Sequence, residues 1–328
     1  MFKKQLKQEL MKYEKSNNFY KYQERFHEIP TNLYKYRSID YFGLKGLLED
    51  ELRLTAPKDL NDPYECAFSM DFMDKLSKIL KELEKKLKIE LLSELNNLYE
   101  SEDVIAGIEK LIQEKNPPKL YKTALNKVLN DSNFRNKYQN KVEVLALTRL
   151  NNSILMWSHY GDYHKGMCLE IPNEALDKNK IYPVFYDKKL HLNTRKINEE
   201  TSKIILSSLV KFEKWNYEEE WRVVDIDIGN NTQDRGGSNL KLKKSFNAIY
   251  LGFNVSEEDE ELIKYIALKK EIKKVYKLKR NNIRYELIIE EVQLQKNSIS
   301  SLERIKEIFR KKFKKKEANE LIKLILSL

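Results

Sequence analysis

The chain has 328 residues, of which 41% are apolar and 34% charged, and its formal net charge is +10. This composition supports a sizeable hydrophobic core and excludes a disordered chain. Two cysteines without metal-like spacing exclude a disulfide framework, and no apolar run reaches the roughly 20 residues of a membrane span. Because the N-terminus lacks an apolar leader, we expect a cytoplasmic protein with no membrane partner. The positive charge favours nucleic acids or nucleotides as partners, although a lysine-rich composition alone gives the same charge.

The first half of the chain predicts one folded unit interrupted by helices. Apolar residues three or four apart predict an N-terminal helix over residues 1–28. The segments "LYKYR" and "LRLT" predict short strands on either side of a helix at "YFGLKGLLEDE", and a turn-rich loop, "APKDLNDPYECAF", follows. Residues 71–140 combine helical spacing with dense alternating charge, which predicts a helical insertion on the surface.

The second half predicts further short strands and a few helices, and therefore an α+β fold. Helices are expected over residues 198–213 and at "SEEDEELIKYIAL". Residues 296–328 predict a basic amphipathic helix or helix pair, which either docks on the core at 29–295 or contacts nucleic acid through "RKKFKKK". Strands are expected at "KVEVLALTRL", "GMCLEIP", "IYPVFYD", "WRVVDIDI", "FNAIYLGFNV", "KKVYKLKR" and "RYELIIEEV".

Two short motifs place charge near the start of the core. In a strand, Lys35 and Arg37 of "LYKYRS" point to one face and the neighbouring tyrosines to the other. Such a pair of cations forms either a clamp for a phosphate or carboxylate, or the solvated edge of a sheet. In "LNDPYE", Asx and proline chemistry predicts a turn, from which Glu65 could form an ion pair with an arginine.

The segment "MWSHYGDYHKG" concentrates aromatic and imidazole side chains. Trp157, His159, Tyr160 and His164 suit a flat heterocycle through stacking and edge hydrogen bonds. A packed aromatic corner with hydrogen-bonded histidines is the alternative. Two histidines without a neighbouring cysteine fall short of a zinc ligand set, so we predict no metal site.

The segment "NYEEEWRVV" carries three consecutive glutamates. At strand spacing Glu218, Glu220 and Arg222 share one face, whereas Glu219 points to the other. A fixed carboxylate stabilises the oxocarbenium-like transition state of glycosidic cleavage, and an arginine beside it keeps it ionised. A solvated acidic helix end is the alternative interpretation of the same letters.

These four motifs, in this order, resemble the bacterial domain-of-unknown-function family DUF2971. The layout is also similar, more distantly, to ADP-ribosyltransferases that modify nucleic acids: "LYKYRSIDYFGLKGLLEDELRL" resembles their first strand–helix–strand block, and "EEEWRVV" their glutamate-bearing strand. Lys35 stands where many of those proteins have a histidine. This resemblance implies a core of short strands in two small packed sheets.

The resemblance further implies NAD as substrate and the transfer of ADP-ribose to a macromolecule. RNA or DNA is the favoured acceptor and a protein acceptor is the alternative. It implies a bacterial toxin or phage-defence effector with a neutralising partner. Glu220 would be the catalytic carboxylate and Glu218 its partner. The residues that would bind NAD are Lys35, Tyr36, Arg37, Trp157, His159, Tyr160 and His164; those that would support the substrate or the structure are Asn61, Asp62, Glu65 and Arg222.

Two other functions are open from the residues alone. A metal-dependent nuclease would use the histidines and four carboxylates that lie far apart in the sequence: Asp62, Glu65, Glu218 and Glu220. A non-enzymatic module would bind a ligand or partner through the aromatic segment. One structural question separates these hypotheses. The ADP-ribosyltransferase hypothesis requires Arg37 and Glu220 to line one cleft together with either Tyr160 or His159.

Overall fold

The computed structural model describes the greater part of the core and the C-terminal region. The predicted N-terminal helix over 1–28 and the predicted helical insertion over 71–140 fall almost wholly outside the described residues. The described residues are 28–62, 64–65, 81–82, 85, 119, 122–123, 141–188, 200–226, 237–294 and 300–328.

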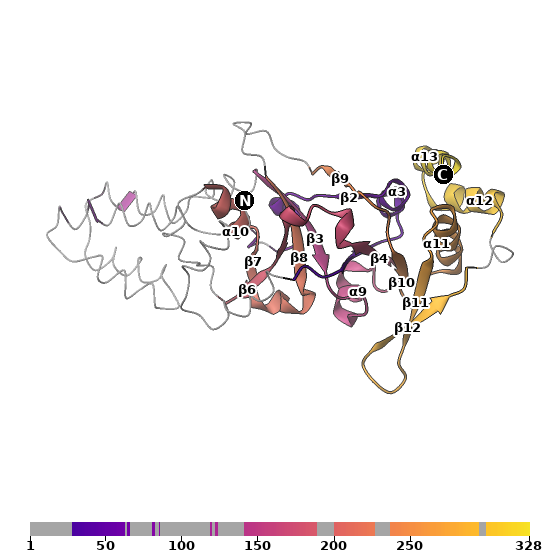
Figure 1. The fold of residues 1–328 in the computed structure, drawn as a ribbon, viewed down its shortest axis with the longest axis horizontal. Coiled ribbons are helices and arrows are strands. Elements are labelled where there is room, and N and C mark those ends of the chain that lie inside the picture. Colours follow the sequence, from indigo (N-terminus) through magenta and orange to yellow (C-terminus); the bar gives the residue numbers. More distant parts are fainter. Residues whose placement is uncertain are drawn as a thin grey trace.

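The centre of the described structure is an eight-stranded sheet with the strand order β12-β11-β10-β4-β1-β3-β8-β5 (Figure 1). Neighbouring strands are antiparallel except β10 and β11, which run parallel and are joined through helix α11 (Glu257–Lys269). The strands are β1 (Asn32–Arg37), β3 (Val142–Thr148), β4 (Met167–Pro172), β5 (Ile181–Pro183), β8 (Glu220–Ile226), β10 (Ala248–Leu251), β11 (Lys274–Arg280) and β12 (Leu287–Val292).

The α+β class is confirmed, but the prediction of two small packed sheets is wrong. Cys168 of β4 lies opposite Tyr36 of β1 on one side and Tyr250 of β10 on the other, so early and late strands share one sheet. Strand periodicity gives the face of each side chain but not the neighbouring strand. Two two-stranded sheets complete the described strands: β2 (Glu51–Arg53) with β9 (Asn239–Lys241), and β6 (Phe185–Asp187) with β7 (Val210–Phe212).

Two segments differ locally from their predicted structure. "IYPVFYD" is not one strand, because β5 ends at Pro183, which has no backbone N–H to donate, and the chain then joins the small sheet as β6. The predicted helix over 198–213 is shorter: α10 (Glu200–Ser207) ends and β7 follows at Val210. This early ending places Lys211 in a strand.

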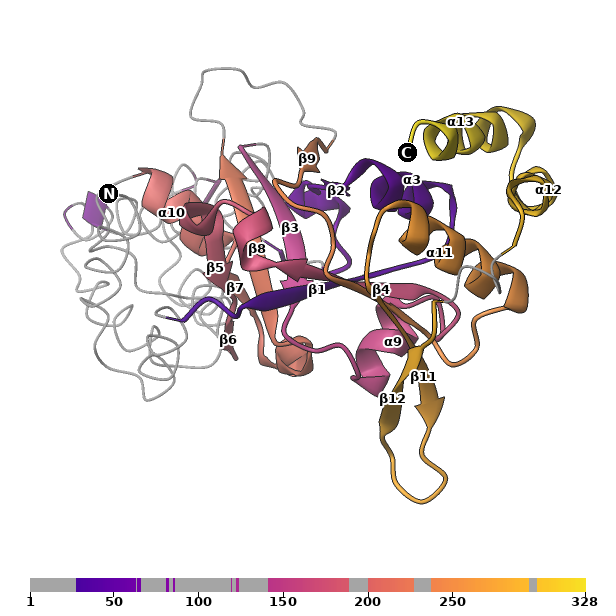
Figure 2. The same cartoon turned by 45° about the vertical axis from the view of Figure 1, so that its right-hand side comes forward.

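Apolar side chains bury both faces of the large sheet. Leu33, Leu169 and Ile249 pack on one face with four helices, which gather at one end of the molecule (Figures 1 and 2). These helices are α3 (Tyr41–Glu49), α11, α12 (Leu302–Lys312) and α13 (Lys315–Leu326). Tyr36 and Trp157 pack on the other face, where α9 (Ile154–Tyr160) lies.

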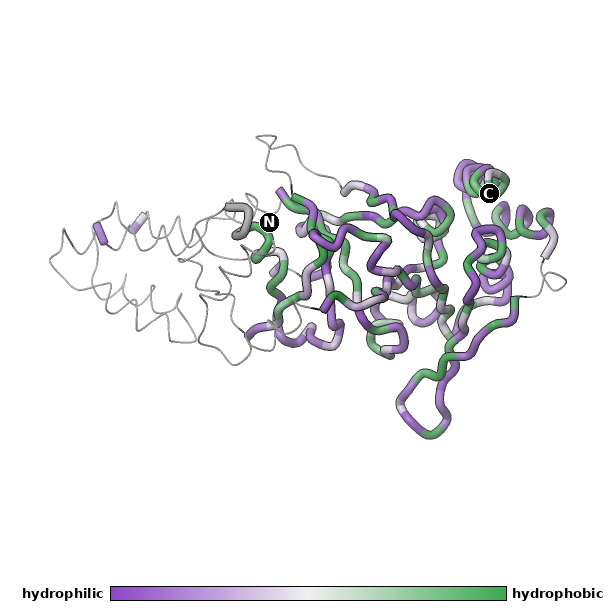
Figure 3. The backbone as a smooth tube through the Cα atoms, viewed as in Figure 1, coloured by the Kyte–Doolittle hydropathy of each residue, from purple (hydrophilic) through white to green (hydrophobic). Residues whose placement is uncertain are grey.

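The basic C-terminal segment is a pair of helices that docks on the core. Figure 3 shows hydrophilic and hydrophobic residues alternating along both helices, and the apolar face of α12 buries Phe309 completely. On the opposite side, Lys311 pairs with Glu258 at 2.6 Å and Lys312 pairs with Asp259, in the acidic first turn of α11. Two cations of "RKKFKKK" therefore hold the helix pair to the core.

The described residues contain no helix that is both long and apolar enough to cross a bilayer.

We predict that Phe309→Ala lowers the free energy of unfolding by about 3–5 kcal/mol, because the ring is fully buried and its loss leaves a cavity. Denaturant-induced unfolding measures this change. Leu326→Ala, at a side chain that is 59% exposed, is the control and should change stability by about 0.5 kcal/mol or less. Equal effects of the two substitutions would show that the C-terminal helices are not part of the core.

Candidate functional site

A cleft is lined by residues of β1 and β3. These two strands are paired at Tyr34 and Thr148, and both of these residues line the cleft. The cleft has a volume of about 270 Å³. We call it the carboxylate cleft, after the side chains that line it: the charged residues Lys35, Asp59, Glu65, Lys211, Glu218, Glu220 and Arg222, and the tyrosines Tyr34, Tyr36 and Tyr160.

One residue with positive φ brings the two glutamates together. The prediction of a strand through Glu218 is wrong: residues Glu213–Glu218 form a 3-10 helix, and β8 begins only at Glu220. Between them Glu219 adopts the left-handed conformation, with φ 42°. This reversal points Glu218 and Glu220 into the carboxylate cleft and directs Glu219 outward to Arg149, 2.5 Å away. The predicted convergence of Glu218, Glu220 and Arg222 is therefore found, on a different backbone.

Arg222 is the centre of a buried network of charges. Its guanidinium donates two hydrogen bonds to Glu65, at 2.7 and 2.6 Å, and two to Glu220, at 2.7 and 3.1 Å. It also donates to the carbonyl of Ser208 at 2.5 Å. The predicted ion pair of Glu65 with an arginine is thus present. The five charged residues of this network, Glu65, Lys211, Glu218, Glu220 and Arg222, are only 1–6% exposed.

Lys211 is the member of the network that sequence reasoning missed. Its ammonium donates to Glu218 at 2.6 Å and to Glu220 at 3.1 Å, and so bridges the two carboxylates. Lys211 lies in β7, which the sequence predicted as the end of a helix. If the helix is known to end at Ser207, strand alternation places Lys211 on the face opposite to Val210 and Phe212 and so predicts an inward-pointing charge. Without that boundary the sequence does not indicate it.

A second chain of hydrogen bonds reaches Glu218 from the aromatic segment. The hydroxyl of Tyr160 donates to Glu218 at 2.5 Å, and the amide of Asn61 donates to the same hydroxyl at 3.0 Å. Tyr160 ends α9, whose Ser153 N-cap accepts from Met156 N. The "LNDPYE" loop, the aromatic segment and the glutamate segment therefore meet around the carboxylate of Glu218. Their order in the chain does not reveal this proximity.

The environments of the two glutamates drive their pKa values apart. Burial opposes the charge of Glu220, but Arg222 and Lys211 outweigh it and lower the pKa of Glu220 to about 2. Burial dominates at Glu218 and raises its pKa, despite the opposing influence of Lys211. Such a divergence lets one site hold an ionised carboxylate beside one that binds a proton more readily.

Lys35 brings a third cation to the carboxylate cleft from β1. Its ammonium donates to the carbonyl of Ala146 at 2.7 Å. The pKa of Lys35 is lowered to about 7, mainly by burial and also by the charge of Arg37, against the raising influence of Glu220. Lys35 therefore loses its proton close to neutral pH, which changes the net charge of the carboxylate cleft by one unit.

Several residues predicted to bind NAD or support the substrate lie elsewhere. Trp157 is fully buried and its indole donates to Asn151 O at 2.9 Å. His159 contacts the hydroxyl of Tyr217 at 2.9 Å, and His164 packs against Phe253 with ring centroids 4.5 Å apart. These residues form the packed aromatic corner that was the alternative interpretation. Asp62 is buried and accepts from Tyr64 N at 2.9 Å, which fixes the predicted turn.

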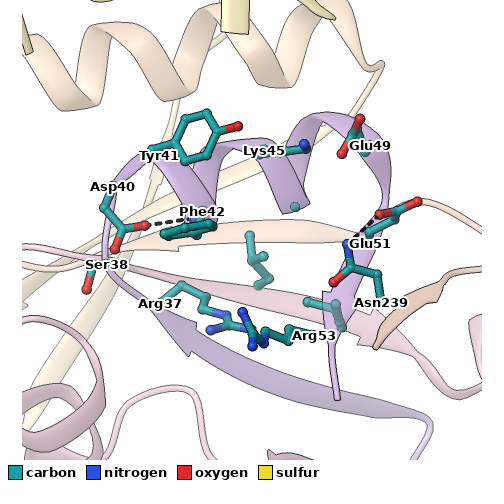
Figure 4. Close-up of a pocket in the computed structure, with 14 residues that line it drawn as sticks. Arg37, Ser38, Asp40, Tyr41, Phe42, Lys45, Glu49, Glu51, Arg53 and Asn239 are labelled. Atoms are coloured by element: carbon teal, nitrogen blue, oxygen red, sulfur yellow. Dashed lines mark hydrogen bonds between the residues drawn. The ribbon is translucent and has the colours of Figure 1, made fainter. Parts of the chain in front are cut away.

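Arg37 lies at a second pocket rather than at the carboxylate cleft. Its neighbours there are the side chains of α3 and β2, including Phe42 and Arg53 (Figure 4). The cleft brings together Tyr160 and Glu220 but not Arg37 or His159. Lys35, two residues before Arg37, supplies the cation that the cleft receives from β1.

The fold and site define an α+β protein in which a large mixed sheet opens onto a charged, tyrosine-lined cleft. Residues 156–223 match the model of a family described as "Protein of unknown function (DUF2971)". This segment is therefore similar to the DUF2971 family, in agreement with the resemblance that its motifs predicted. The matched segment contains Tyr160, Lys211, Glu218, Glu220 and Arg222. Searches against curated proteins and against solved structures gave no match.

No cluster of three or more histidine, cysteine or acidic side chains with the geometry to hold a metal ion occurs in the described part of the chain. The acidic side chains that do converge are bonded to Arg222 and Lys211.

Removing the guanidinium at the centre of the network should be costly. Arg222→Met leaves Glu65 and Glu220 buried without their main partner, so we expect a loss of about 3–5 kcal/mol in the free energy of unfolding. Arg149→Met removes the exposed pair with Glu219 and should cost about 1 kcal/mol or less. Urea titrations of both variants measure the difference. A loss at Arg222 no larger than that at Arg149 would contradict the buried network.

Lys35 should also make stability depend on pH. The unfolded chain holds the Lys35 proton up to a pKa near 10.5, whereas the folded chain releases it at about 7. Between these values the unfolded state binds more protons, so the stability of the protein rises with pH across this window. Lys35→Met removes this contribution. Urea midpoints at the two ends of the window should therefore rise less in the variant than in the parent protein, and parallel pH profiles would contradict the assignment.

Proposed function

We propose that the carboxylate cleft cleaves the bond between nicotinamide and ribose in NAD and transfers ADP-ribose to an acceptor. The observation that supports this most directly is the presence, in one tyrosine-lined cleft, of two glutamates whose pKa values are shifted in opposite directions. The resemblance of the glutamate segment to ADP-ribosyltransferases supports the same reaction class.

Glu220 would stabilise the charge that develops on the ribose. As the bond from C1 of the ribose to nicotinamide breaks, its electron pair leaves with the nicotinamide nitrogen and a cation develops at C1. Because Arg222 and Lys211 hold Glu220 ionised, the carboxylate carries its charge throughout the reaction. Glu220 accepts three hydrogen bonds from these two side chains, which leaves acceptor capacity for a ribose hydroxyl.

Glu218 would receive the proton of the acceptor. The acceptor oxygen forms a bond to C1 and its hydrogen passes to the Glu218 carboxylate, whose raised pKa suits a proton acceptor. Tyr160 positions this carboxylate through the 2.5 Å hydrogen bond, and Asn61 positions Tyr160. Glu218 is thus the second catalytic residue of the proposal, and Tyr160 its positioning residue.

The size and lining of the carboxylate cleft indicate how NAD would lie. A volume of about 270 Å³ is slightly below the range of whole small-molecule sites, so the cleft accommodates one nucleoside-sized half of the dinucleotide. Tyr34, Tyr36 and Tyr160 present ring surface for the nicotinamide, and the Lys35 amine offers a hydrogen-bond donor for a ribose or phosphate oxygen.

The acceptor is proposed to be RNA or DNA, on the basis of the net charge of +10. A toxin or phage-defence effector with a neutralising partner fits such an activity. A metal-dependent nuclease is less favoured, because the cations of Arg222 and Lys211 already occupy oxygens of the three convergent glutamates. A non-enzymatic role of the network would leave the acceptor capacity of Glu218 and Glu220 unused.

The test is the release of nicotinamide from labelled NAD, with RNA, DNA and protein acceptors. Glu220→Gln removes the negative charge that stabilises the cation at C1. It should lower the rate by at least about 100-fold, the scale of losing one preorganised electrostatic contact. Glu218→Gln should lower transfer, and its pH profile should lose the limb that reports the proton acceptor. Glu219→Gln makes the same chemical change one residue away, on the outward side chain, and is the matched control.

The outcomes separate the candidate functions. Equal activity of the Glu219→Gln and Glu220→Gln variants would remove Glu220 from catalysis. Cleavage of nucleic acid that needs a divalent metal and no NAD would favour the nuclease. No turnover with any acceptor, together with a loss of stability in Glu220→Gln, would favour the non-enzymatic role.

A further inference from the structure

The hairpin of β11 and β12 carries a pocket at its end. Its loop, residues 281–286, projects away from the body of the described structure (Figures 1 and 2). A pocket of about 460 Å³ lies between this loop, the start of α9 and the chain after β10. We call it the hairpin pocket; the side chains that line it include Ile154, His164, Phe253, Arg280, Arg284 and Tyr285.

The tip of the hairpin exposes two large side chains that no core requires. Ile283 is 93% exposed and Tyr285 is 101% exposed. The tip nevertheless has a defined turn, because the side-chain oxygen of Asn281 accepts from the backbone N–H groups of Ile283, at 2.8 Å, and Arg284, at 3.2 Å. Exposed apolar side chains that gather on one element mark an interaction site more often than isolated ones do.

Two arginines at the hairpin pocket have no acidic partner in the part of the chain that the structure describes. Arg280 and Arg284 are both exposed, and neither forms an ion pair with a described residue. The guanidinium of Arg280 lies over the ring of Phe253, 5.2 Å from its centroid. A contact with an aromatic ring does not neutralise the charge, so both guanidinium groups can bind an anion.

The other titratable side chains near the tip do not cancel this charge. Glu286 is the one acidic residue among those that line the hairpin pocket, and its carboxylate accepts a hydrogen bond from the amide of Asn281. Glu290 pairs with Lys279 at 2.5 Å. Burial lowers the pKa of His164, which favours its neutral form. Two guanidinium groups against one carboxylate therefore give the hairpin pocket a net positive charge.

We propose that the hairpin pocket and the tip beside it bind a single-stranded nucleic acid. Arginines bind the phosphates of such a strand through charge-assisted hydrogen bonds, and exposed aromatic rings stack on its unpaired bases. Arg280, Arg284 and Tyr285 provide both kinds of group within one hairpin. The volume of about 460 Å³ is within the range of small-molecule sites and suits an unstacked base, which a contact with an acidic protein surface does not require.

The hairpin pocket lies on the same face of the large sheet as the carboxylate cleft. Leu287, which lines the hairpin pocket, and Met156, which lines the carboxylate cleft, belong to one packed cluster that includes Trp157. Strands β11 and β1 are three inter-strand steps apart, or about 14 Å. A strand held at the hairpin can therefore reach the carboxylate cleft within a few nucleotides. This inference rests on the proposed function, because it assigns the nucleic-acid acceptor a binding surface.

The test is the fluorescence anisotropy of a labelled single-stranded oligonucleotide of about twelve nucleotides, titrated with the full chain in the absence of NAD. Tyr285→Ala should weaken the affinity by about tenfold, the scale of one base–aromatic stack. Arg284→Gln should weaken binding and lower the slope of log affinity against log salt concentration by about 0.7, the contribution of one phosphate contact on a single strand.

Two matched controls lie on helices that cover the opposite face of the sheet. Phe42→Ala removes a ring of α3 that is 72% exposed, and Arg310→Gln removes an exposed guanidinium of α12. Both should leave the affinity within about twofold, because they lie beyond the screening distance of the hairpin. All four side chains are exposed, so the variants should fold, and thermal melting of each checks this.

Unchanged affinity in Tyr285→Ala, or an unchanged salt slope in Arg284→Gln, would overturn the proposal. Equal weakening by the two controls would also overturn it, because it would indicate general attraction to a basic surface. Duplex binding as tight as single-strand binding would contradict the role of unpaired bases. No binding by the parent protein would overturn the proposal in favour of an acidic protein partner.

The failure of this proposal can be distinguished from the failure of the proposed reaction. Oligonucleotide binding is measured without NAD and needs neither Glu218 nor Glu220. Glu220→Gln should therefore lose NAD cleavage and keep the parent affinity for the oligonucleotide.

Discussion

The carboxylate cleft depends on the bonds that Arg222 makes to Glu65 and Glu220. These bonds join the loop after β2 to β8 across a long stretch of sequence, and all three side chains are almost completely buried. Taking charges out of water is costly, so a buried set of this kind persists only when each member keeps its partners. The network therefore fixes the loop, β7 and β8 relative to one another. The position of the cleft follows from that constraint.

The same charges give the two glutamates different chemistry. Glu220 lies against both Arg222 and Lys211 and has a depressed pKa, whereas Glu218 shares only Lys211 and has a raised one. The difference arises from a single backbone reversal at Glu219, which places one carboxylate nearer the arginine than the other. A continuous strand would place the two carboxylates along one face without turning the intervening residue. The backbone reversal at Glu219, which strand alternation does not predict, therefore produces the difference between the pKa values of the two glutamates.

The sequence predicted those features that depend on local chemistry. Strand alternation located β1, β3, β4 and β8, and local cap chemistry located the start of α11 at Ser256. The pairing of Glu65 with an arginine and the inward face of Glu220 were also foreseeable from turn and strand patterns. Lys211, the order of the sheet and the separation of Arg37 from Lys35 were not, because each depends on contacts between segments distant in sequence. His159 and His164 lie against the rings of Tyr217 and Phe253, contacts that their positions in the sequence could not show.

A fully paired buried network and a catalytic site make different demands on the same residues. A network that serves only stability gains nothing from an opening to solvent, and its carboxylates are best replaced by apolar side chains of similar volume. Here Glu218 and Glu220 line a cleft and retain acceptor capacity, and Tyr160 joins Glu218 to α9 and to Asn61. Glu65 forms the bidentate pair with Arg222, which holds the loop after β2 to β8. Glu218 and Glu220 line the space where a substrate would lie. The geometry of the network therefore separates these two glutamates from the pair of Glu65 and Arg222 that joins the loop to β8.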